Sequence, residues 1–377
     1  MGSRKLLFFV TEDWYFCSHR LPLGVAARAA GYDVVVVTRV REHGERITAA
    51  GLRLIPFEMS RRSANPLAEL GVLWRLWRVY RTERPDIVHH VSLKPVLYGS
   101  LVAKLAGMRA IVNAMAGLGI LFSSDSSKAR LLRPLVKTVF RLLLGDRREL
   151  LILQNQDNVA EMTEAGIVPA ERIRLVRGAG VDLAEFAVQP EPSGVPRILL
   201  VARMLWDKGV GDFVAAARLL HERGVVAECV LVGEPDVANP AAIPLQQLRA
   251  WHAEGVVRWL GRREDVAALY AGCHIACLPS FYGEGIPKSL LEAAASGRAI
   301  VTTDAPGCRE VVQHEGNGLL VPVRDPAALA DAFARLVSDA ELRQRMGRVS
   351  RERAEQEFAL ALSVQQTLDV YTELLPG

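Results

Sequence analysis

The sequence predicts an α/β protein with two consecutive domains, each built on a parallel β-sheet that helices cover on both faces. Short, continuous apolar runs rich in Val, Ile and Leu alternate with helical patterns along the chain, which is typical of buried parallel sheets. The alternation stops once, at a segment rich in Pro and Gly, and then starts again. The length of 377 residues is too great for one ordinary domain and suits two.

The first half of the chain contains six runs that we expect to form strands. They are KLLFFVT at 5–11, YDVVVVT at 32–38, LRLIPF at 52–57, DIVHHVS at 86–92, RAIVNAM at 109–115 and LLILQN at 150–155. Patterns such as RLPLGVAARAAG and PLAELGVLWRLWRVYRTER lie between them. Their apolar spacing predicts helices that connect consecutive strands.

Six further runs follow the segment EPSGVP at 191–196, which we interpret as a linker. They are RILLVAR at 197–203, AECVLVG at 227–233, VVRWLG at 256–261, IACLPS at 275–280, RAIVTTD at 298–304 and GLLVPV at 318–323. The predicted domains are therefore residues 1–190 and 191–357. Both are Rossmann-like, with ligands expected at the carboxyl ends of the strands. The last helical stretch, residues 358–377, could pack on either domain.

The composition indicates a globular protein whose two halves differ in charge. Residues 1–180 hold 27 Lys and Arg against 16 Asp and Glu (+11), and the remainder holds 19 against 26 (−7). A basic half suggests contact with an anionic surface or substrate. The five cysteines lack zinc-site spacing, so we expect free, mostly buried thiols. The motifs G-x-x-x-x-G-K-[ST], G-x-G-x-x-G, H-E-x-x-H and D-x-D are absent from the sequence, which disfavours catalysts of those types.

The stretch FYGEGIPKSLLEAAASGRAIVTTDAPGCREVV, residues 281–312, places two glutamates around a predicted helix start. Pro287 favours a first helical turn, so Glu284 would lie in the preceding loop and Glu292 inside the helix. The free N–H groups of a first turn bind anions such as phosphate, and carboxylates accept hydrogen bonds from hydroxyl groups. The pattern fits a nucleotide sugar, which has hydroxyl groups on both sides of its phosphates. Alternatively, Glu292 is a solvated helix residue and Glu284 complements the helix dipole.

Two cations follow the predicted strand RILLVAR. Arg203 ends the run, and Lys208 comes five residues later in MLWDKG. At the carboxyl end of a strand, the guanidinium fork and the ammonium point charge can together neutralise a diphosphate. Because both cations share a unit with Glu284 and Glu292, they strengthen the nucleotide-sugar interpretation.

Taken together, these motifs resemble the family 4 retaining glycosyltransferases of the GT-B fold. The second half carries the resemblance in VARMLWDKGVGDF, LVGEPDVANP, VVRWLGRREDV, the 281–312 stretch and NGLLVPVRD. The first half, with TEDWYFCSHRLPL, DIVHHVSLKPVLYGS, NAMAGLGILF and LILQNQDN, is similar to a bacterial subgroup that extends polyprenyl-diphosphate-linked surface oligosaccharides. The resemblance implies two Rossmann-like domains facing each other across a cleft, with the last helix crossing back to the N-terminal, acceptor-binding domain.

The resemblance also implies roles for residues of the nucleotide-sugar-binding second half. Arg203 and Lys208 match diphosphate-binding cations. Glu284 matches an acid that contacts the donor sugar, and Glu292 one that holds the ribose hydroxyl groups. The further donor-binding positions implied in this way are Gly285, Ile286, Lys288, Ser289, Arg258 and Arg262, the last two in a segment that cradles the base.

In the first half, the sequence departs from the family pattern. Many members carry a histidine after the strand RAIVNAM, where this chain has Ala116-Gly117-Leu118-Gly119. The candidates for contacts with the sugar or the acceptor are therefore the loop residues Gly117 and Gly119 and two histidines, His19 and His90. Lys94 is a candidate contact to an acceptor phosphate. For each histidine the alternative is an ordinary polar residue at a strand end.

The activity implied by the resemblance is a retaining, metal-independent hexosyl- or N-acetylhexosaminyl transfer to a polyprenyl-diphosphate-linked saccharide. The co-substrate is a nucleotide sugar of the UDP type, with no other cofactor. Two alternatives stay open: a GT-B sugar-nucleotide epimerase, and an inactive membrane-associated binding protein.

Residues 127–148, SKARLLRPLVKTVFRLLLGDRR, interleave basic and apolar side chains around a single acid, Asp146. This pattern is typical of a helix in a membrane interface, and the basic first half suits an anionic inner leaflet. The run LWRLWRVYR, with Trp74 and Trp77, has a similar character, and an amphipathic core helix is the alternative for both stretches. We therefore expect a cytoplasmic protein on the inner face of the cell membrane, without a nucleic-acid partner, since no recognition motif accompanies the charge.

Overall fold

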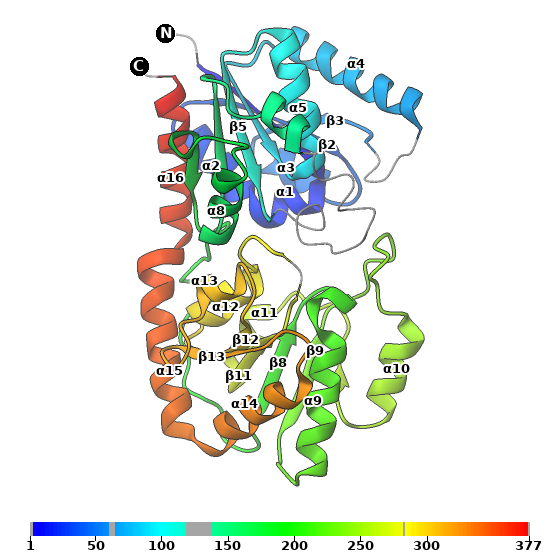
Figure 1. Ribbon diagram of the computed structural model, residues 1–377, viewed down its shortest axis with the longest axis vertical. Helices are drawn as coiled ribbons and strands as arrows, with labels where there is room; N and C mark the ends of the chain where they lie inside the picture. Colours follow the sequence, from blue (N-terminus) through cyan, green and yellow to red (C-terminus); the bar gives the residue numbers. More distant parts are fainter. Residues whose placement is uncertain (1–2, 60–64, 118–136, 282, 376–377) are drawn as a thin grey trace. The chain divides into compact units, whose positions relative to one another are not determined.

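The computed structural model describes residues 3–59, 65–117, 137–281 and 283–375. The chain divides into two compact units (Figure 1), Met1–Ala179 with Ser363–Gly377 and Gly180–Leu362, which we call unit 1 and unit 2. The boundary between the two domains that the sequence predicts follows residue 190. In the structure, residues 180–190 join unit 2, because Val181 and Phe186 pack into its core.

Unit 1 contains a seven-stranded parallel sheet in the order β3-β2-β1-β4-β5-β6-β7. Its strands are β1 (Lys5–Glu12), β2 (Asp33–Arg39), β3 (Arg53–Pro56), β4 (Ile87–Val91), β5 (Ala110–Met115), β6 (Glu149–Leu153) and β7 (Ile173–Leu175). Each of the six predicted runs forms a strand. The three-residue edge strand β7 was not predicted, since it is too short for an apolar pattern.

The described helices of unit 1 connect these strands and cover both faces of the sheet. They include α1 (Asp13–His19), α2 (Leu21–Ala29), α3 (Gly44–Ala49), α4 (Pro66–Glu83), α5 (Leu93–Ala106), α8 (Gln156–Glu164) and the 3-10 turn η1 (Ala170–Arg172). One core lies under α1 and α2 and another under α4 and α5. Strands β4, β5 and β6 are buried along their whole length, which explains their continuous apolar runs.

Unit 2 contains a six-stranded parallel sheet in the order β10-β9-β8-β11-β12-β13. Its strands are β8 (Arg197–Val201), β9 (Glu228–Val232), β10 (Arg258–Trp259), β11 (Ile275–Leu278), β12 (Ala299–Thr303) and β13 (Gly318–Val321). All six predicted runs therefore form strands. Its helical elements are η2 (Trp206–Lys208), α9 (Val210–Glu222), α10 (Leu245–Ala253), α11 (Val266–Ala271), α12 (Lys288–Ala295), α13 (Cys308–Val311), α14 (Pro326–Ser338), α15 (Ala340–Arg353) and the π-helical η3 (Ala354–Phe358).

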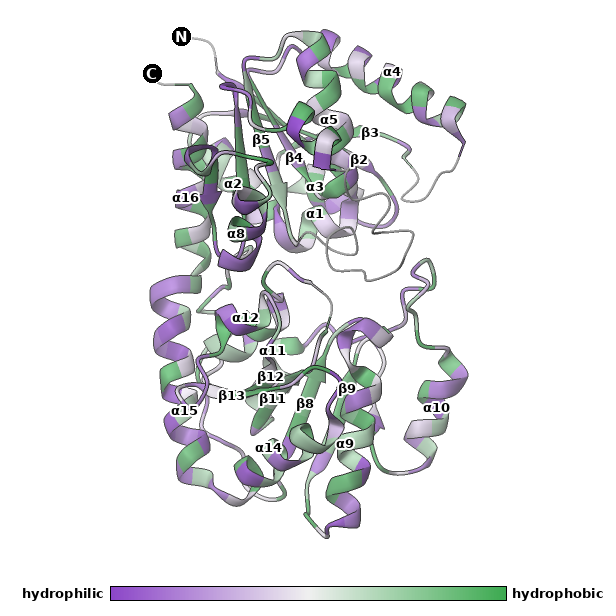
Figure 2. Cartoon of the chain, in the orientation of Figure 1, coloured by the Kyte–Doolittle hydropathy of each residue, from purple (hydrophilic) through white to green (hydrophobic). Residues whose placement is uncertain are grey.

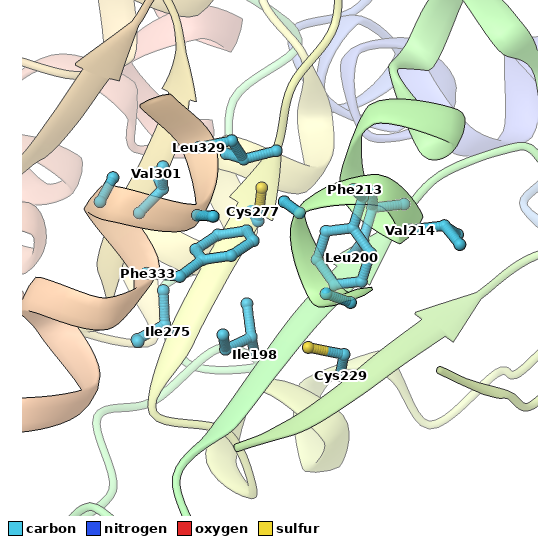
Figure 3. Close-up of a cluster of buried hydrophobic side chains, with 14 of the residues drawn as sticks. Ile198, Leu200, Phe213, Val214, Cys229, Ile275, Cys277, Val301, Leu329 and Phe333 are labelled. Atoms are coloured by element: carbon cyan, nitrogen blue, oxygen red, sulfur yellow. The ribbon is translucent and has the colours of Figure 1, made fainter. Parts of the chain in front are cut away.

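Helices α9 and α14 cover one face of the unit 2 sheet. Figure 3 shows Ile198, Leu200 and Ile275 from the strands packed against Phe213 of α9 and Phe333 of α14. The two phenylalanine rings meet edge to face, with 5.6 Å between their centroids. The colouring in Figure 2 shows the same separation, with hydrophobic strands inside and hydrophilic stretches on the outer helices. All five cysteines are buried free thiols, as expected.

The last helix, α16 (Leu360–Leu374), ends in unit 1. Val370 and Tyr371 belong to the core beside α1 and α2, and the Tyr371 hydroxyl lies 2.6 Å from Nδ1 of His89 in β4. Arg4 Nη1 donates a hydrogen bond to the Leu375 carbonyl at 2.7 Å. The C-terminal segment is therefore part of the core of unit 1.

Candidate functional site

The candidate site of unit 2 lies at the carboxyl ends of β8 and β11. The strand order reverses between these two neighbours, since β8 connects onward to β9 on one side and β11 to β12 on the other. Ligands of open parallel sheets bind at such switch points. The loop after β8 carries Arg203 and Lys208, and the loop after β11 carries Glu284. The fold thus brings together residues that the sequence separates by about eighty positions.

Two glycines allow the loops at this edge to come into direct contact. Gly209 has φ +71°, and a Cβ atom there would lie 2.0 Å from the carbonyl oxygen of Pro279. Gly307 has φ +80°, and its Cβ would lie 1.9 Å from the carbonyl oxygen of Gly285. Both positions therefore require glycine. The backbone N–H of Phe281 also donates to the Asp207 carbonyl at 3.2 Å. The loops after β8, β11 and β12 consequently form one packed backbone layer.

Lys208 and Glu284 form an ion pair in this layer. Lys208 Nζ lies 2.5 Å from Glu284 Oε2, and their side chains are only 15% and 11% exposed. The Ser280 hydroxyl donates to the other carboxylate oxygen of Glu284 at 2.6 Å and so fixes its orientation. An ammonium has three donors, so one bond to Glu284 does not exhaust Lys208. The pair can therefore present a cation and a hydroxyl-binding carboxylate at adjacent points.

Glu292 lies on α12 and is buried. This excludes the alternative that it is a solvated helix residue. Burial raises the pKa of Glu292 to about 7, and the positive charge of Lys288 only partly offsets this effect. Lys288 Nζ lies 3.4 Å from Glu292 Oε1, one helical turn away. A buried carboxylate has several acceptor positions besides the one that faces Lys288, and these are suited to hydroxyl groups of a ligand.

The start of α12 lies between the two glutamates, as predicted. Pro287 is the N-cap residue, and the helix begins at Lys288 and ends at Ala295. The N–H groups of Lys288 and Ser289 belong to the first turn, which attracts anions. Gly285 and Ile286 precede it, and the Ile286 side chain packs into the core. Any ligand contact of Ile286 would therefore involve its backbone.

Arg203 occupies the same edge but has a separate partner. Its Nη1 lies 2.8 Å from Asp236 Oδ2, in the loop after β9, and the arginine is exposed. The interactions of Arg203 and Lys208 thus point to different carboxylates. An exposed ion pair is weak, so an incoming diphosphate could replace Asp236 as the partner of Arg203 at small cost.

Arg258 does not lie at this edge. It is in β10 at the level of Val230 in β9, and its Nη1 reaches back to Glu228, 3.3 Å away, at the first residue of β9. Glu228 also pairs with Arg197, the first residue of β8. These three charges occupy the amino ends of the strands, opposite the site. The position of Arg258 does not support base binding. Arg262, beyond the carboxyl end of β10, stays a prediction.

His90 does not line a site in unit 1. It is fully buried in β4, with Nε2 2.8 Å from the Tyr80 hydroxyl and Nδ1 2.8 Å from Asn113 Oδ1. Burial lowers its pKa to about 4, although the hydrogen bond with Asn113 acts in the opposite direction. His90 is thus a neutral core residue, and its position does not support the expected contact with sugar or acceptor. Both ring nitrogens are already used inside the fold.

The other candidates of unit 1 lie at the carboxyl edge of its sheet. His19 is the last residue of α1, directly after β1, and stacks on Tyr15 at 4.3 Å. Lys94 lies in the first turn of α5, after β4, with Nζ 2.9 Å from Glu69 Oε2 of α4. Strands β1 and β4 flank the switch point of this sheet. Gly117 follows β5 with φ +102°, and Gly119 lies outside the described residues.

The stretch 127–148 is only partly described, from residue 137 onward. Residues 137–143 are helical, and Phe140 and Leu144 are buried in a core with Met115 of β5 and Leu151 of β6. The described apolar face therefore packs inside unit 1, although Leu142 is exposed. Within the described ranges, no helix combines the length and the hydropathy of a membrane span.

Three residues of the unit 2 site were not among those predicted from the sequence. Ser280, which orients Glu284, is the last residue of the run IACLPS and gave no chemical signal. Asp236, the partner of Arg203, lies in LVGEPDVANP without a spacing that marks it. Gly307 could have been found from the dipeptide Pro306-Gly307, which indicates a tight turn.

Comparisons with known proteins agree with this geometry. The family model described as "Glycosyl transferase 4-like" matches residues 5–155, and the model "Glycosyl transferases group 1" matches residues 195–339. A similar curated protein is the N,N'-diacetylbacillosaminyl-diphospho-undecaprenol alpha-1,3-N-acetylgalactosaminyltransferase of Campylobacter jejuni, 29% identical over 94% of this chain and 95% of the relative. The Escherichia coli UDP-Gal:alpha-D-GlcNAc-diphosphoundecaprenol alpha-1,3-galactosyltransferase is 24% identical over 83% of this chain and 82% of the relative.

Among solved structures, Anabaena HepE in complex with UDP and glucose superposes with a TM-score of 0.79 at 17% identity, covering 98% of this chain and 100% of that chain. A glycosyltransferase from Rickettsia africae gives a TM-score of 0.79 at 17% identity with complete coverage of both chains. These two likenesses confirm the fold. With the two family models matching one unit each, the chain belongs to the family 4 glycosyltransferases of the GT-B fold.

Proposed function

We propose that this glycosyltransferase moves a sugar from a UDP-type nucleotide donor to a saccharide linked to polyprenyl diphosphate, with retention of the anomeric configuration. The observation that carries the proposal is the arrangement at the unit 2 switch point. There the Lys208–Glu284 pair and buried Glu292 lie on the two sides of the α12 start along the chain. The names of the Campylobacter and Escherichia relatives, which specify undecaprenol-diphosphate-linked acceptors, support the acceptor class.

In this proposal, the donor diphosphate takes over the cations of the site. Lys208 exchanges Glu284 for a phosphate oxygen, and Arg203 exchanges Asp236 in the same way. Glu284 is then available to the hydroxyl groups of the donor sugar, while Glu292 accepts from the ribose. Charges positioned in advance for a leaving group contribute much of the rate enhancement in such reactions.

The transfer step needs no nucleophilic side chain. The bond between the anomeric carbon and the diphosphate oxygen breaks, and the acceptor hydroxyl oxygen forms a new bond to the same carbon on the same face. The hydroxyl proton passes to the departing diphosphate, whose negative charge Lys208, Arg203 and the α12 N–H groups stabilise. The product is an elongated polyprenyl-diphosphate-linked saccharide and free nucleoside diphosphate.

We also propose that the protein works at the inner face of the cell membrane, where a polyprenyl-linked acceptor is held. The basic residues of 127–148 support this location through their attraction to anionic lipid. The acceptor candidates in unit 1 are His19, Gly117, Gly119 and Lys94, with Lys94 directed to a phosphate.

The experiment is a panel of UDP-sugars incubated with polyprenyl-diphosphate-linked saccharides, with the anomeric configuration of the product determined by NMR. We expect one donor to be used, with the same anomeric configuration in donor and product and with activity maintained in a chelator. An inverted linkage would contradict retention. Interconversion of the donor without acceptor would identify an epimerase, and donor binding without any transfer would identify a binding protein.

A further inference from the structure

Helix α4 has two apolar faces, of which only one is buried. Val72, Leu76 and Tyr80 face inward and pack on the unit 1 sheet and α5. On the outside, Leu67, Leu70, Trp74 and Trp77 are 78%, 61%, 56% and 39% exposed. Their spacing of three, four and three residues places them on one stripe of the helix. We call these four residues the outer stripe.

The outer stripe is unusual for a protein surface. Single exposed apolar residues are normal, but a row with two tryptophans indicates a contact surface. The helix does not need the stripe for its own stability, because Asn65 caps its start by accepting hydrogen bonds from the N–H groups of Leu67 and Ala68. The inner face supplies its packing. Figure 2 shows hydrophobic and hydrophilic residues alternating along α4.

Arginines accompany the tryptophans of the stripe. The Arg78 guanidinium lies 4.9 Å from the ring centroid of Trp74, and that of Arg81 lies 5.8 Å from the ring of Trp77. Both arginines are exposed. Cation–π contacts hold the guanidinium groups beside the rings. Apolar and basic groups therefore form one surface. It is complementary to anionic lipid, which offers acyl chains to the apolar groups and phosphates to the arginines. An acidic partner with few apolar groups would match only the arginines.

The outer stripe begins beside the carboxyl edge of the unit 1 sheet. Glu69, in the first turns of α4, accepts hydrogen bonds from Lys94 Nζ at 3.0 Å and from the Tyr98 hydroxyl at 2.6 Å. Lys94 follows β4, next to the switch point of this sheet. A surface that binds lipid here would bring the bilayer to the edge where an acceptor phosphate is proposed to bind.

We propose that the outer stripe of α4, together with Arg78 and Arg81, inserts into the interface of an anionic bilayer and brings the lipid-linked acceptor to the edge of the sheet marked by Lys94. The membrane contact then includes α4 besides the basic residues of 127–148, whose described apolar side chains Phe140 and Leu144 pack inward. The part of the inference that concerns delivery of the acceptor rests on the proposed function. Vesicle binding itself can be measured without any transfer.

The first experiment is flotation of the full chain with phosphatidylglycerol–phosphatidylcholine vesicles and with phosphatidylcholine vesicles. We expect binding to the anionic vesicles, and a decrease of about tenfold or more in the partition coefficient of the Trp74→Ser/Trp77→Ser double variant. Arg78→Gln/Arg81→Gln should weaken binding only to the anionic vesicles. Leu105→Ser, at an exposed leucine of α5, and Arg249→Gln, at an exposed arginine of α10, are the matched controls and should bind like wild type.

Brominated lipid provides a second measurement. It should quench tryptophan fluorescence in wild type and much less in the double variant, since the remaining tryptophans lie elsewhere. With acceptor embedded in vesicles, the double variant should transfer at least about tenfold more slowly, whereas a short-chain, water-soluble acceptor should be used at the wild-type rate. Loss of transfer with both acceptors in wild type would contradict the proposed function and leave the binding result unaffected.

Three outcomes would overturn the inference. One is wild-type vesicle binding by the double variant. Another is loss of binding in Arg147→Gln/Arg148→Gln but not in the α4 variants, which would assign the contact to the end of 127–148. A third is a wild-type protein that is dimeric in sedimentation and does not bind vesicles, together with a double variant that is monomeric. This result would make the outer stripe a protein–protein contact.

Discussion

The switch points of the two sheets have the same strand geometry but use their polar residues differently. In unit 2, Lys208 and Glu284 come from loops beyond the strand ends and meet at the edge. In unit 1, His90 is still within β4 and points into the core, where it binds Tyr80 and Asn113. A polar residue inside a buried strand therefore serves the fold, whereas one beyond its carboxyl end is available to a ligand.

Removal of the Lys208–Glu284 pair at the unit 2 edge tests this comparison most directly and should have the largest effect. Glu284→Ala and Lys208→Ala should each lower kcat/KM by about 10² to 10³, because positioned charges stabilise the leaving diphosphate and the reacting sugar. The measurement is steady-state transfer at saturating acceptor. The two side chains are only 15% and 11% exposed, and removing one leaves the charge of the other unpaired, so the melting temperature of each variant is measured first and transfer is compared below it.

Arg258→Ala is the matched control for these variants, since it removes a cation from the opposite edge of the same sheet. It should transfer like wild type. Activity of Glu284→Ala within a factor of about two of wild type would remove the assigned roles at this edge.

The next largest effect is expected in unit 1, on stability alone. His90→Phe removes the buried partner of the Tyr80 hydroxyl and one hydrogen bond of Asn113 Oδ1, which still accepts from the Ser100 hydroxyl, so the free energy of unfolding should fall by about 1–3 kcal/mol. Below the melting transition, kcat and both KM values should stay at the wild-type level. A large loss of kcat in a stably folded His90→Phe protein would show that the residue acts in the reaction.

Glu292 gives a pH-dependent test of the unit 2 site. Its pKa of about 7 is raised from the usual 4.5 by burial, so the carboxyl group is largely protonated below pH 7 and ionised above it. The affinity for a UDP-sugar, whose diphosphate stays ionised over this range, should rise between about pH 6 and 8, around the pKa of Glu292, and level off above about 8. Glu292→Gln should bind about tenfold more weakly at pH 8 and lose the pH dependence. Titration calorimetry measures both.

The stability of the unliganded protein should respond to Glu292 with the opposite sign. Because the folded pKa lies above the unfolded value, the native state holds the proton more tightly, and stability falls as the pH rises between about 4.5 and 7. Chemical denaturation across this range should show a shallower decrease for Glu292→Gln. An equal slope in both proteins would contradict the raised pKa.

The smallest effect is expected at Lys94. Since Glu69 already neutralises it, Lys94→Met should raise the KM for the lipid-linked acceptor by only about threefold and leave the KM for the donor unchanged. Glu69→Gln is the counterpart, and it should lower the acceptor KM because it leaves the ammonium charge to the acceptor phosphate. A change in the KM for the donor alone in Lys94→Met would contradict the assignment of Lys94 to the acceptor.

Much of the fold could be predicted from the sequence, because buried parallel strands such as β2, with VVVV, and β11, with IACL, contain continuous apolar runs. The strand β7 could not, since its three residues carry no pattern. For the site, the positions of Glu284, Lys208 and the α12 start followed from local signals. Their pairing did not, because the contact joins residues 76 positions apart and depends on the packing of Gly209 and Gly307. The reach of Arg258 toward Glu228 could not be predicted either, because sequence order does not show toward which end of a strand a long side chain extends.

The return of α16 to unit 1 has a consequence for biosynthesis. Unit 2 is encoded as an insertion between two parts of unit 1, and Val370 and Tyr371 complete the unit 1 core only when α16 has been synthesised after unit 2. On the ribosome, unit 2 can therefore fold while unit 1 still lacks part of its interior. A stop codon within α16 before Val370 would leave His89 without its tyrosine partner and remove two side chains from the unit 1 core.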